Sequence, residues 1–302
     1  MNEETPEKLA AIIAEEDATP DMVPVITKEI YHYYILSAMR ENGFLERLTF
    51  QGGTSLRLCQ ASPRYSEDLN FAGGFDFSLD DFTTLGTIIE NRLKEISPGS
   101  HVTVRPPTRE RKVNKWSIQI RTAPLAKDMP SQRIKLEIAT IPSHDPRMAL
   151  ARVNYAHLEG MFFPIPISAE SREEILADKM LSYVASGHIR YRDLWDMGWI
   201  SGQTTIDPAH VWKMIDLKQS DYDEQPNWGE RLESDRNITI IMQSKEFANE
   251  LGRFITPQAR RRTIQDPLWI EATANQLKNL FKEYLQHELY RESSIGKRAS
   301  HE

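Results

Sequence analysis

The chain has 302 residues, of which 40% are hydrophobic, with 37 lysines and arginines against 44 aspartates and glutamates. This length suits one large domain or two ordinary ones. The net charge of -7 argues against a protein that coats nucleic acid through its overall charge, so a nucleic-acid partner would need a local basic patch. The single cysteine, Cys59, excludes an internal disulfide and a thiolate-rich zinc site, and we expect it to be a buried small hydrophobic residue.

The sequence lacks the features of a membrane or secreted protein. It contains no run of the roughly 18 apolar residues that a membrane-spanning helix needs. Its first ten residues are acidic, whereas a signal peptide begins with basic residues followed by apolar ones. We therefore expect a soluble, cytoplasmic protein with no membrane partner.

The first half of the chain mixes helical and strand patterns. Apolar residues at helical spacing predict helices over 7–16 and 26–41. The segment 48–56 predicts a short strand, a tight turn at Gly52-Gly53 and the start of a helix. Alternating polar and apolar residues then predict strands over 64–71, 101–106, 114–122 and 133–140. These strands imply a single sheet.

Beyond about Pro166 the periodicity is helical almost to the end of the chain. It predicts helices over 171–186, 190–201, 207–218, 244–255 and 267–290. The polar segment 220–237 is typical of a surface loop. We therefore predict an α+β fold with two domains. Residues 1–165 form a mixed sheet with flanking helices, and residues 166–302 form an all-helical C-terminal domain.

A row of polar residues follows one predicted strand. Side chains alternate between the two faces of a strand, so Ser66, Asp68 and Asn70 share one face. Leu69 and Phe71 point to the other face and can enter a core. Two oxygen donors beside a hydroxyl suit a magnesium ion that keeps several waters and binds a nucleotide phosphate. A half-exposed strand that ends in a turn explains the same residues equally well.

A second polar row lies on the predicted strand 133–140. The same alternation places Lys135 and Glu137 on one face. If the two strands are neighbours, Asp68, Asn70 and Glu137 could converge on one or two metal ions, with Lys135 available to a phosphate. The alternative is a cross-strand pair between lysine and glutamate on a solvated face.

The turn before the first polar row could also bind a ligand. The four residues Gly52 to Ser55 precede a predicted helix and could offer backbone N–H groups and hydroxyls to a phosphate. An ordinary N-capped turn has the same composition. The pattern is not a P-loop, because no lysine follows the glycines.

Five motifs in this order resemble those of the AbiEii/AbiGii family of nucleotidyltransferase toxins, over roughly residues 48–200. The motifs are Gly52-Gly53-Thr54-Ser55-Leu56, then residues 64–71, 134–138, Ala177-Asp178-Lys179-Met180 and finally 190–196. The resemblance implies a minimal nucleotidyltransferase fold and the toxin of a bacterial toxin–antitoxin pair that acts in abortive infection, a phage defence. It also implies an NTP substrate with Mg²⁺ or Mn²⁺ as cofactor. The acceptor would be RNA, most often the tRNA 3′ end, whose modification blocks translation. A cognate antitoxin encoded nearby would be the protein partner.

The resemblance also assigns roles to individual residues. It implies nucleotide contacts at Gly52, Gly53, Thr54, Ser55, Ser66 and Lys135, metal ligands at Asp68, Asn70 and Glu137, and catalytic roles for Asp68, Glu137, Lys179 and Asp193. Lys179 matches the family's downstream lysine, which is expected on the triphosphate. Without the family match, Lys179 and Asp193 would be explained equally well by ion pairs on helix surfaces.

One position departs from the family pattern. Members usually have Asp-x-Asp in the acidic strand, whereas this chain has Asp68-Leu69-Asn70. Asparagine can donate a neutral carbonyl ligand but contributes no charge. Three outcomes follow: an enzyme with one metal, a site completed by Glu137 and a nearby aspartate such as Asp76, or a nucleotide binder with little activity.

Basic residues gather in two places despite the acidic total. They include Arg109, Arg111 and Lys112 in one segment, and Arg260, Arg261 and Arg262 in another. Such patches suit an RNA backbone, although the second also suits an acidic antitoxin or a solvated linker. Two other classes of function stay open. One is a small-molecule nucleotidyltransferase, and the other is a catalytically weakened nucleotide-binding interaction protein.

Overall fold

The computed structural model describes residues 4–122, 131–203, 206–223, 225–234 and 237–299. These residues form two compact units. The first, which we call the α/β unit, contains residues 1–171 and a short later segment, 253–256. The second, which we call the helical unit, contains residues 172–252 and 257–302. The chain therefore returns to the α/β unit after most of the helical unit has been formed.

The α/β unit is built around one seven-stranded sheet with the order β3-β4-β5-β2-β1-β7-β6. Its strands are β1 (Thr49–Gln51), β2 (Leu69–Ala72), β3 (His101–Arg105), β4 (Val113–Arg121), β5 (Gln132–Ala139), β6 (Pro146–Ala151) and β7 (Ile165–Glu170). The pairs β2–β5 and β1–β7 are parallel and the other pairs are antiparallel. The sheet is therefore mixed, as the sequence predicts.

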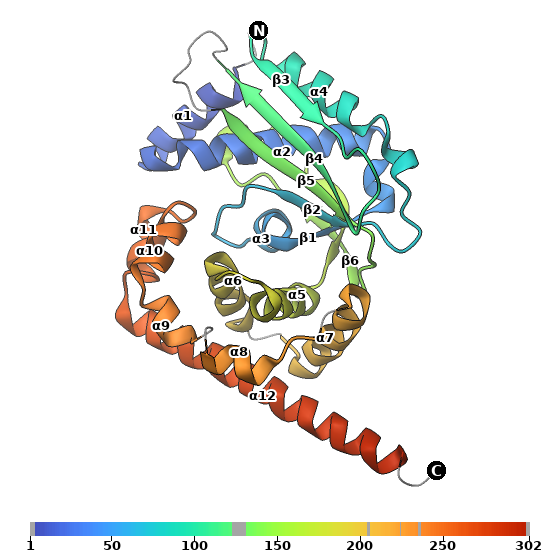
Figure 1. Cartoon of the computed structure of the whole chain (residues 1–302). Coiled ribbons are helices and arrows are strands. Elements are labelled where there is room, and N and C mark those ends of the chain that lie inside the picture. Colours follow the sequence, from blue (N-terminus) through green and yellow to red (C-terminus); the bar gives the residue numbers. More distant parts are fainter. Residues whose placement is uncertain (1–3, 123–130, 204–205, 224, 235–236, 300–302) are drawn as a thin grey trace. The chain divides into compact units, whose positions relative to one another are not determined.

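Helices cover one face of this sheet. The helices of the unit are α1 (Pro6–Glu16), α2 (Val23–Glu41), α3 (Gly52–Gln60) and α4 (Leu85–Ile96). Figure 1 shows α2 and α4 along one face. At Gly86 of α4 a Cβ atom would lie 3.5 Å from Val104 and 3.6 Å from Trp116, so α4 lies directly on β3 and β4. The alternating apolar residues of β4 and β5, such as Trp116 and Leu136, are fully buried on this side. The polar residues of the same strands consequently point to the opposite face, which we call the open face.

The predicted strand 64–71 is wrong for its first five residues, because β2 begins only at Leu69. Residues 64–68 find hydrogen-bond partners outside the sheet. The Tyr65 N–H donates to the carbonyl oxygen of Phe254 at 2.7 Å, and the Thr54 hydroxyl donates to the carbonyl oxygen of Asp68. Since these backbone groups are already bonded, the segment runs up to the sheet without joining its ladder.

The helical unit contains α5 (Arg172–Ala185), α6 (Tyr191–Ser201), α7 (Pro208–Tyr222), α8 (Trp228–Ser234), α9 (Ile238–Met242), α10 (Lys245–Gly252), α11 (Pro257–Arg262) and α12 (Pro267–Ala299). The predicted loop over 220–237 is wrong, because α8 lies inside it. Trp228 is 2% exposed and its ring centroid lies 4.6 Å from that of Tyr284, so one aromatic anchor holds this polar helix. Periodicity does not detect a helix of seven residues in which Trp228 is the only fully buried apolar side chain.

Two further strands were not predicted from the sequence. Residues 165–170, where helical periodicity was expected to begin, form β7, and residues 146–151 form the edge strand β6. In β6 the side chains of Met148 and Leu150 are exposed, so the burial alternation that marks a strand is missing. No helix among the described residues is both long enough and apolar enough to cross a membrane.

Candidate active site

The two polar rows predicted from the sequence lie side by side on the open face. Strands β2 and β5 are parallel neighbours, and Asn70 is the register partner of Glu137. Asp68 directly precedes β2, and its carboxylate accepts a hydrogen bond at 3.1 Å from the backbone N–H of Lys135. The structure thus brings Asp68, Asn70, Lys135 and Glu137 onto adjacent strands with their side chains on one face.

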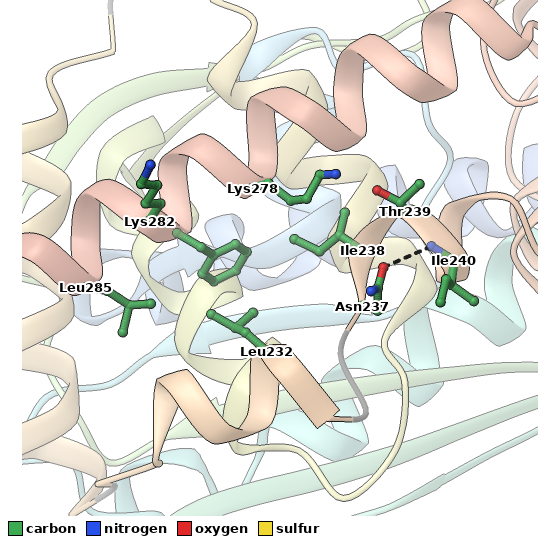
Figure 2. A pocket seen from close by; sticks show the side chains of 9 residues that line it. Leu232, Asn237, Ile238, Thr239, Ile240, Lys278, Lys282 and Leu285 are labelled. Atoms are coloured by element: carbon green, nitrogen blue, oxygen red, sulfur yellow. Dashed lines mark hydrogen bonds between the residues drawn. The ribbon is translucent and has the colours of Figure 1, made fainter.

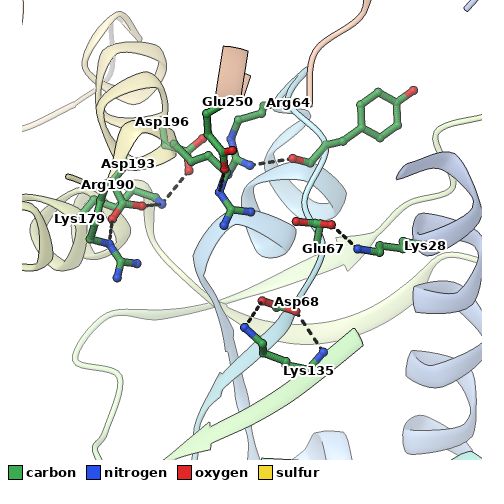
Figure 3. Close-up of polar contacts among 12 residues, drawn as sticks. Lys28, Arg64, Glu67, Asp68, Lys135, Lys179, Arg190, Asp193, Asp196 and Glu250 are labelled. Atoms are coloured by element: carbon green, nitrogen blue, oxygen red, sulfur yellow. Dashed lines mark hydrogen bonds and ion pairs between the residues drawn. The ribbon is translucent and has the colours of Figure 1, made fainter. Parts of the chain in front are cut away.

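Each carboxylate of this group has a lysine nearby. The Lys135 Nζ lies 3.8 Å from Asp68 Oδ2, as Figure 3 shows, and the Lys115 Nζ lies 3.5 Å from Glu137 Oε1. Both carboxylates are about one-third exposed, at 30% and 31% of their side-chain area. Ion pairs this open to water contribute little stability. An incoming cation or phosphate can therefore compete for these partners.

The glycine turn packs directly against the polar row. Gly52 has φ +75°, a conformation that favours glycine, and a Cβ atom there would lie 3.3 Å from Asn70 Nδ2. At Gly53 a Cβ atom would lie 2.5 Å from an Arg64 guanidinium nitrogen and 2.9 Å from the Ser66 hydroxyl oxygen. The absence of side chains at these two positions lets the start of α3 lie beside Ser66 and Asn70.

The two hydroxyls that follow the glycines are buried. Thr54 and Ser55 are 1% and 0% exposed, and the Thr54 hydroxyl is used within the protein to hold the Asp68 carbonyl oxygen. The Thr54 side chain therefore fastens α3 to the segment that carries Asp68. A phosphate at this turn would be bound by backbone N–H groups at the positive end of the helix dipole.

Helix α2 supports the same segment from the other side of the sheet. Lys28 forms an ion pair with Glu67, which Figure 3 also shows. The His32 Nε2 lies 3.1 Å from the carbonyl oxygen of Glu67, to which it donates. Burial lowers the pKa of His32, so the ring is neutral at pH 7. These contacts fix the backbone on the N-terminal side of Asp68.

A buried acid anchors α2 to α3. Glu29 accepts a hydrogen bond from Arg57 at 2.9 Å, and it also accepts 2.7 Å hydrogen bonds from the Tyr33 hydroxyl and the Asn154 amide. Burial alone would raise the pKa of Glu29, but the Arg57 charge and these hydrogen bonds outweigh it and hold the pKa below its ordinary value. Glu29 was not predicted from the sequence, because it lies among the apolar positions of a helix.

In the helical unit, Lys179 lies between two carboxylates. Its Nζ is 2.9 Å from Asp193 Oδ1 and 2.7 Å from Asp196 Oδ2, and Arg190 also pairs with Asp193, as Figure 3 shows. Burial would raise the pKa of Asp193, but Lys179 and Arg190 together lower it to about 2. Asp193 and Lys179, which the family motif pairs, are thus in direct contact. Asp196 was not predicted, although its spacing of three from Asp193 places both on one helical side.

A second ion cluster in the helical unit has no counterpart in the sequence-based predictions. Lys218 is fully buried, with its Nζ 2.9 Å from Glu174 Oε1 and 3.2 Å from Asp178 Oδ2. Burial is the largest influence on Asp178 and raises its pKa, despite the opposing charge of Lys218. This cluster ties α7 to α5, the helix that also carries Lys179.

The predicted basic residues lie on the surface of the two units. Arg109, Arg111 and Lys112 are exposed in the connection between β3 and β4. In α11, Arg261 and Arg262 are exposed, whereas Arg260 is half-buried. The two groups belong to different units.

The donor set on the open face is chemically suited to Mg²⁺ or Mn²⁺. Asp68, Asn70 and Glu137 offer carboxylate and amide oxygens, which are the ligands of hard cations. Within the described ranges no cluster of three histidine, cysteine, aspartate or glutamate residues could form a protein cage. A magnesium ion that binds nucleotide phosphates needs only one or two carboxylates and keeps several waters, so an open site of this kind fits it. Asp76 lies in the turn beyond the far end of β2, whereas Asp68 precedes that strand.

A separate cavity of about 460 Å³ lies in the helical unit, between α8, α9 and α12. Figure 2 shows its apolar lining, which includes Leu232, Ile238 and Leu285, with Lys278 and Lys282 of α12 also along it. None of the residues predicted to act in nucleotide transfer lines this cavity.

The profile of the AbiEii family, described as nucleotidyl transferase toxins of type IV toxin–antitoxin systems, matches residues 34–288. The chain belongs to this family, which confirms the resemblance seen in the sequence.

One solved structure shows the same fold, and two others are also similar to this chain. The nucleotidyltransferase toxin MenT4 from Mycobacterium tuberculosis H37Rv has a TM-score of 0.60 and 19% identity, covering 92% of this chain and 89% of that chain. JHP933 from Helicobacter pylori has a TM-score of 0.47 and 16% identity over 92% and 98% of the two chains. A putative nucleotidyltransferase from H. pylori has a TM-score of 0.48 and 15% identity over 87% and 95%. Among curated proteins, no sequence matches this chain. The MenT4 comparison confirms the predicted α+β fold with a helical C-terminal part.

Proposed function

We propose that the protein transfers a nucleoside monophosphate from an NTP to the 3′ end of an RNA. We propose that this RNA is a tRNA and that its modification blocks translation. The observation that carries the proposal is the convergence of Asp68, Asn70 and Glu137 on the open face beside the Gly52-Gly53 turn. The cognate antitoxin of such a type IV system would counteract this activity. We also propose that the protein acts in the cytoplasm, where its RNA substrate is found.

The reaction is an in-line displacement at the α-phosphorus of the NTP. The RNA 3′ oxygen forms a bond to this phosphorus, the bond to the β-phosphate oxygen breaks, pyrophosphate leaves, and the 3′ hydroxyl proton passes to solvent. A divalent cation bound at Asp68 and Asn70, with Glu137 beside it, would supply positive charge that offsets the charge on the phosphates. Positioning and charge stabilisation supply most of the rate in reactions of this kind.

The protein groups have separate tasks in this scheme. The Lys135 backbone N–H orients the Asp68 carboxylate, and the Lys135 ammonium is available to a phosphate oxygen. The backbone N–H groups after Gly53 would bind the leaving pyrophosphate. Lys179 and Asp193 enter the proposal from the family motif. Their ion pair holds the lysine side chain in one position, which suits a role on the triphosphate.

Asn70 bears on the number of metal ions. It occupies the register position beside Glu137, so the site has one carboxylate fewer than the usual family pattern would place there. Asp76, beyond the other end of β2, does not replace it. We therefore propose a site with one metal ion, in which asparagine supplies a neutral oxygen.

The test is transfer of each α-labelled NTP to purified total tRNA with magnesium, read on a denaturing gel. We expect a labelled tRNA band with the wild-type protein and its loss with Asp68→Ala. As a matched control, Asp80→Ala removes an exposed carboxylate in the same unit and should leave the band unchanged. Near-normal transfer by the Asp68→Ala variant would show that the site is elsewhere. With one metal ion, Asn70→Asp should not raise the rate, whereas a faster variant would show that a second metal ion is limiting.

Asn70 also favours a second function, that of a nucleotide-binding interaction protein with little turnover. It would bind labelled NTP in equilibrium dialysis but give no product with tRNA. A small-molecule nucleotidyltransferase would instead label an acceptor such as an aminoglycoside under the same conditions.

A further inference from the structure

The open face extends beyond the candidate active site across three strands. The register between β3, β4 and β5 aligns their outward-facing residues in rows. The rows are His101 with Arg121, then Thr103 with Gln119 and Arg133, and then Arg105 with Ser117 and Lys135. The last row continues to Asp68, whose carboxylate is bonded to the backbone of Lys135. A continuous polar surface therefore leads from the edge strand β3 to Asp68.

This surface is basic although the whole chain is acidic. Arg105, Arg121 and Arg133 are exposed, and none of them forms an ion pair with a described residue. We call these three residues the arginine face. Lys135, the lysine in the row that reaches Asp68, already pairs with the Asp68 carboxylate. The three arginines thus keep their charge available to a ligand.

The composition of the surface distinguishes between kinds of partner. In these rows the other outward-facing side chains are those of threonine, serine, glutamine, histidine and lysine, and the exposed apolar residue of β4, Val113, lies outside them. Protein–protein interfaces usually have an apolar core, which this surface lacks. Arginine and hydroxyl or amide side chains are instead the groups that contact a nucleic-acid backbone.

We propose that the arginine face binds the phosphate backbone of the RNA acceptor and leads its 3′ end to Asp68. Three strand spacings separate β3 from β2, or about 14 Å, so the surface is long enough to contact more than one phosphate. Arginine is suited to this task because its planar guanidinium can donate two parallel hydrogen bonds to one phosphate. The inference rests on the proposed function. It assigns acceptor binding to residues of the strands β3, β4 and β5.

The test compares two triple variants of the full chain. One replaces the arginine face by glutamine (Arg105→Gln, Arg121→Gln and Arg133→Gln). The control replaces Arg47, Arg92 and Arg147 by glutamine; these arginines lie elsewhere in the same unit and pair with Asp81, Glu41 and Asp145. Both variants remove the same number of positive charges, so a difference between them reports position rather than net charge.

Binding of fluorescent total tRNA is measured by anisotropy without NTP at several KCl concentrations, and KM is measured separately for tRNA and NTP. For the first variant we expect about tenfold weaker tRNA binding. The slope of log K against log salt should also fall by about 2, because each lost phosphate contact removes about 0.7. KM for tRNA should rise while KM for NTP stays constant. Equal affinities and slopes in the two variants would overturn the inference, even if transfer by the wild type is confirmed.

The remaining outcomes separate the inference from the proposed function. If the first variant loses tRNA binding but the wild type transfers no nucleotide to tRNA, the arginine face stands and the proposed reaction fails. If the first variant loses inhibition by the antitoxin while its tRNA affinity is unchanged, the surface binds a protein and the inference is wrong.

Discussion

The ion pairs around Lys179 predict how strongly Asp193 stabilises the folded protein. The ordinary pKa of 3.8 falls to about 2 in the folded state, because Lys179 and Arg190 outweigh the effect of burial. Since one pKa unit corresponds to 1.36 kcal/mol, the charged form of Asp193 contributes about 2 kcal/mol to the free energy of unfolding. Replacing Asp193 by asparagine removes this contribution while keeping the shape of the side chain.

The pH dependence of this stabilisation shows whether the charge of Asp193 is its cause. A carboxylate whose pKa is lowered on folding contributes its full stabilisation above the unfolded pKa of 3.8, and this stabilisation is lost as pH falls through about 2. Asp193→Asn should therefore be less stable than the wild type by about 2 kcal/mol at pH 7, and by about half of that at pH 3.

The assay is urea unfolding followed by tryptophan fluorescence, because Trp195 is buried on the same helix as Asp193. The control Asp80→Asn alters an exposed aspartate that forms no ion pair with any residue that the structure describes, and should unfold like the wild type at both pH values. Equal stability of Asp193→Asn and the wild type at pH 7 would refute the reasoning. A deficit of the same size at pH 7 and pH 3 would show that packing, rather than charge, is responsible.

Three further predictions concern the α/β unit. Gly53→Ala should lower the melting temperature and weaken NTP binding, because its Cβ would lie 2.5 Å from the buried Arg64 guanidinium; unchanged NTP binding in calorimetry would contradict this. Glu29→Gln should cost about 3 kcal/mol in urea unfolding, since it leaves the Arg57 charge buried without a carboxylate, and a cost near zero would show that the pair is not needed. Cys59 is half-buried rather than buried, and this partial burial raises the pKa of its thiol to about 12, so iodoacetamide at pH 8 should label it much more slowly in the folded protein than in urea; equal rates in the two would contradict this.

The sheet was the most predictable part of the fold. Alternation in β4 and β5 marks one buried and one solvated face, so both strands and the facing of Lys135 and Glu137 could be read from the sequence. The sequence could not show that Lys135 and Glu137 lie next to Asp68, because no local pattern specifies which strands pair. The parallel pairing of β2 with β5 joins residues far apart in the chain, and it supplies that missing information.

The parts that could not be predicted depend on tertiary contacts. Met148 and Leu150 leave the edge strand β6 without a regular buried face, and α8 is held by the buried Trp228 and by hydrogen bonds from Arg231 to the carbonyl oxygens of Val184 and Ser186. The roles of Glu29 and Lys218 were also hidden, since a charged residue within an amphipathic helix is normally solvated. Only their partners on other elements, Arg57 and Glu174, explain why they are buried.

The return of residues 253–256 to the α/β unit affects the order in which the protein can be completed during synthesis. The segment that carries Asp68 is bonded through Tyr65 to the carbonyl oxygen of Phe254, which is 1% exposed. A nascent chain released from the ribosome only as far as residue 171 lacks this partner, although it already contains every strand of the sheet. The backbone around Asp68 reaches its final arrangement only after most of the helical unit has been translated. The candidate active site is therefore completed only near the end of translation.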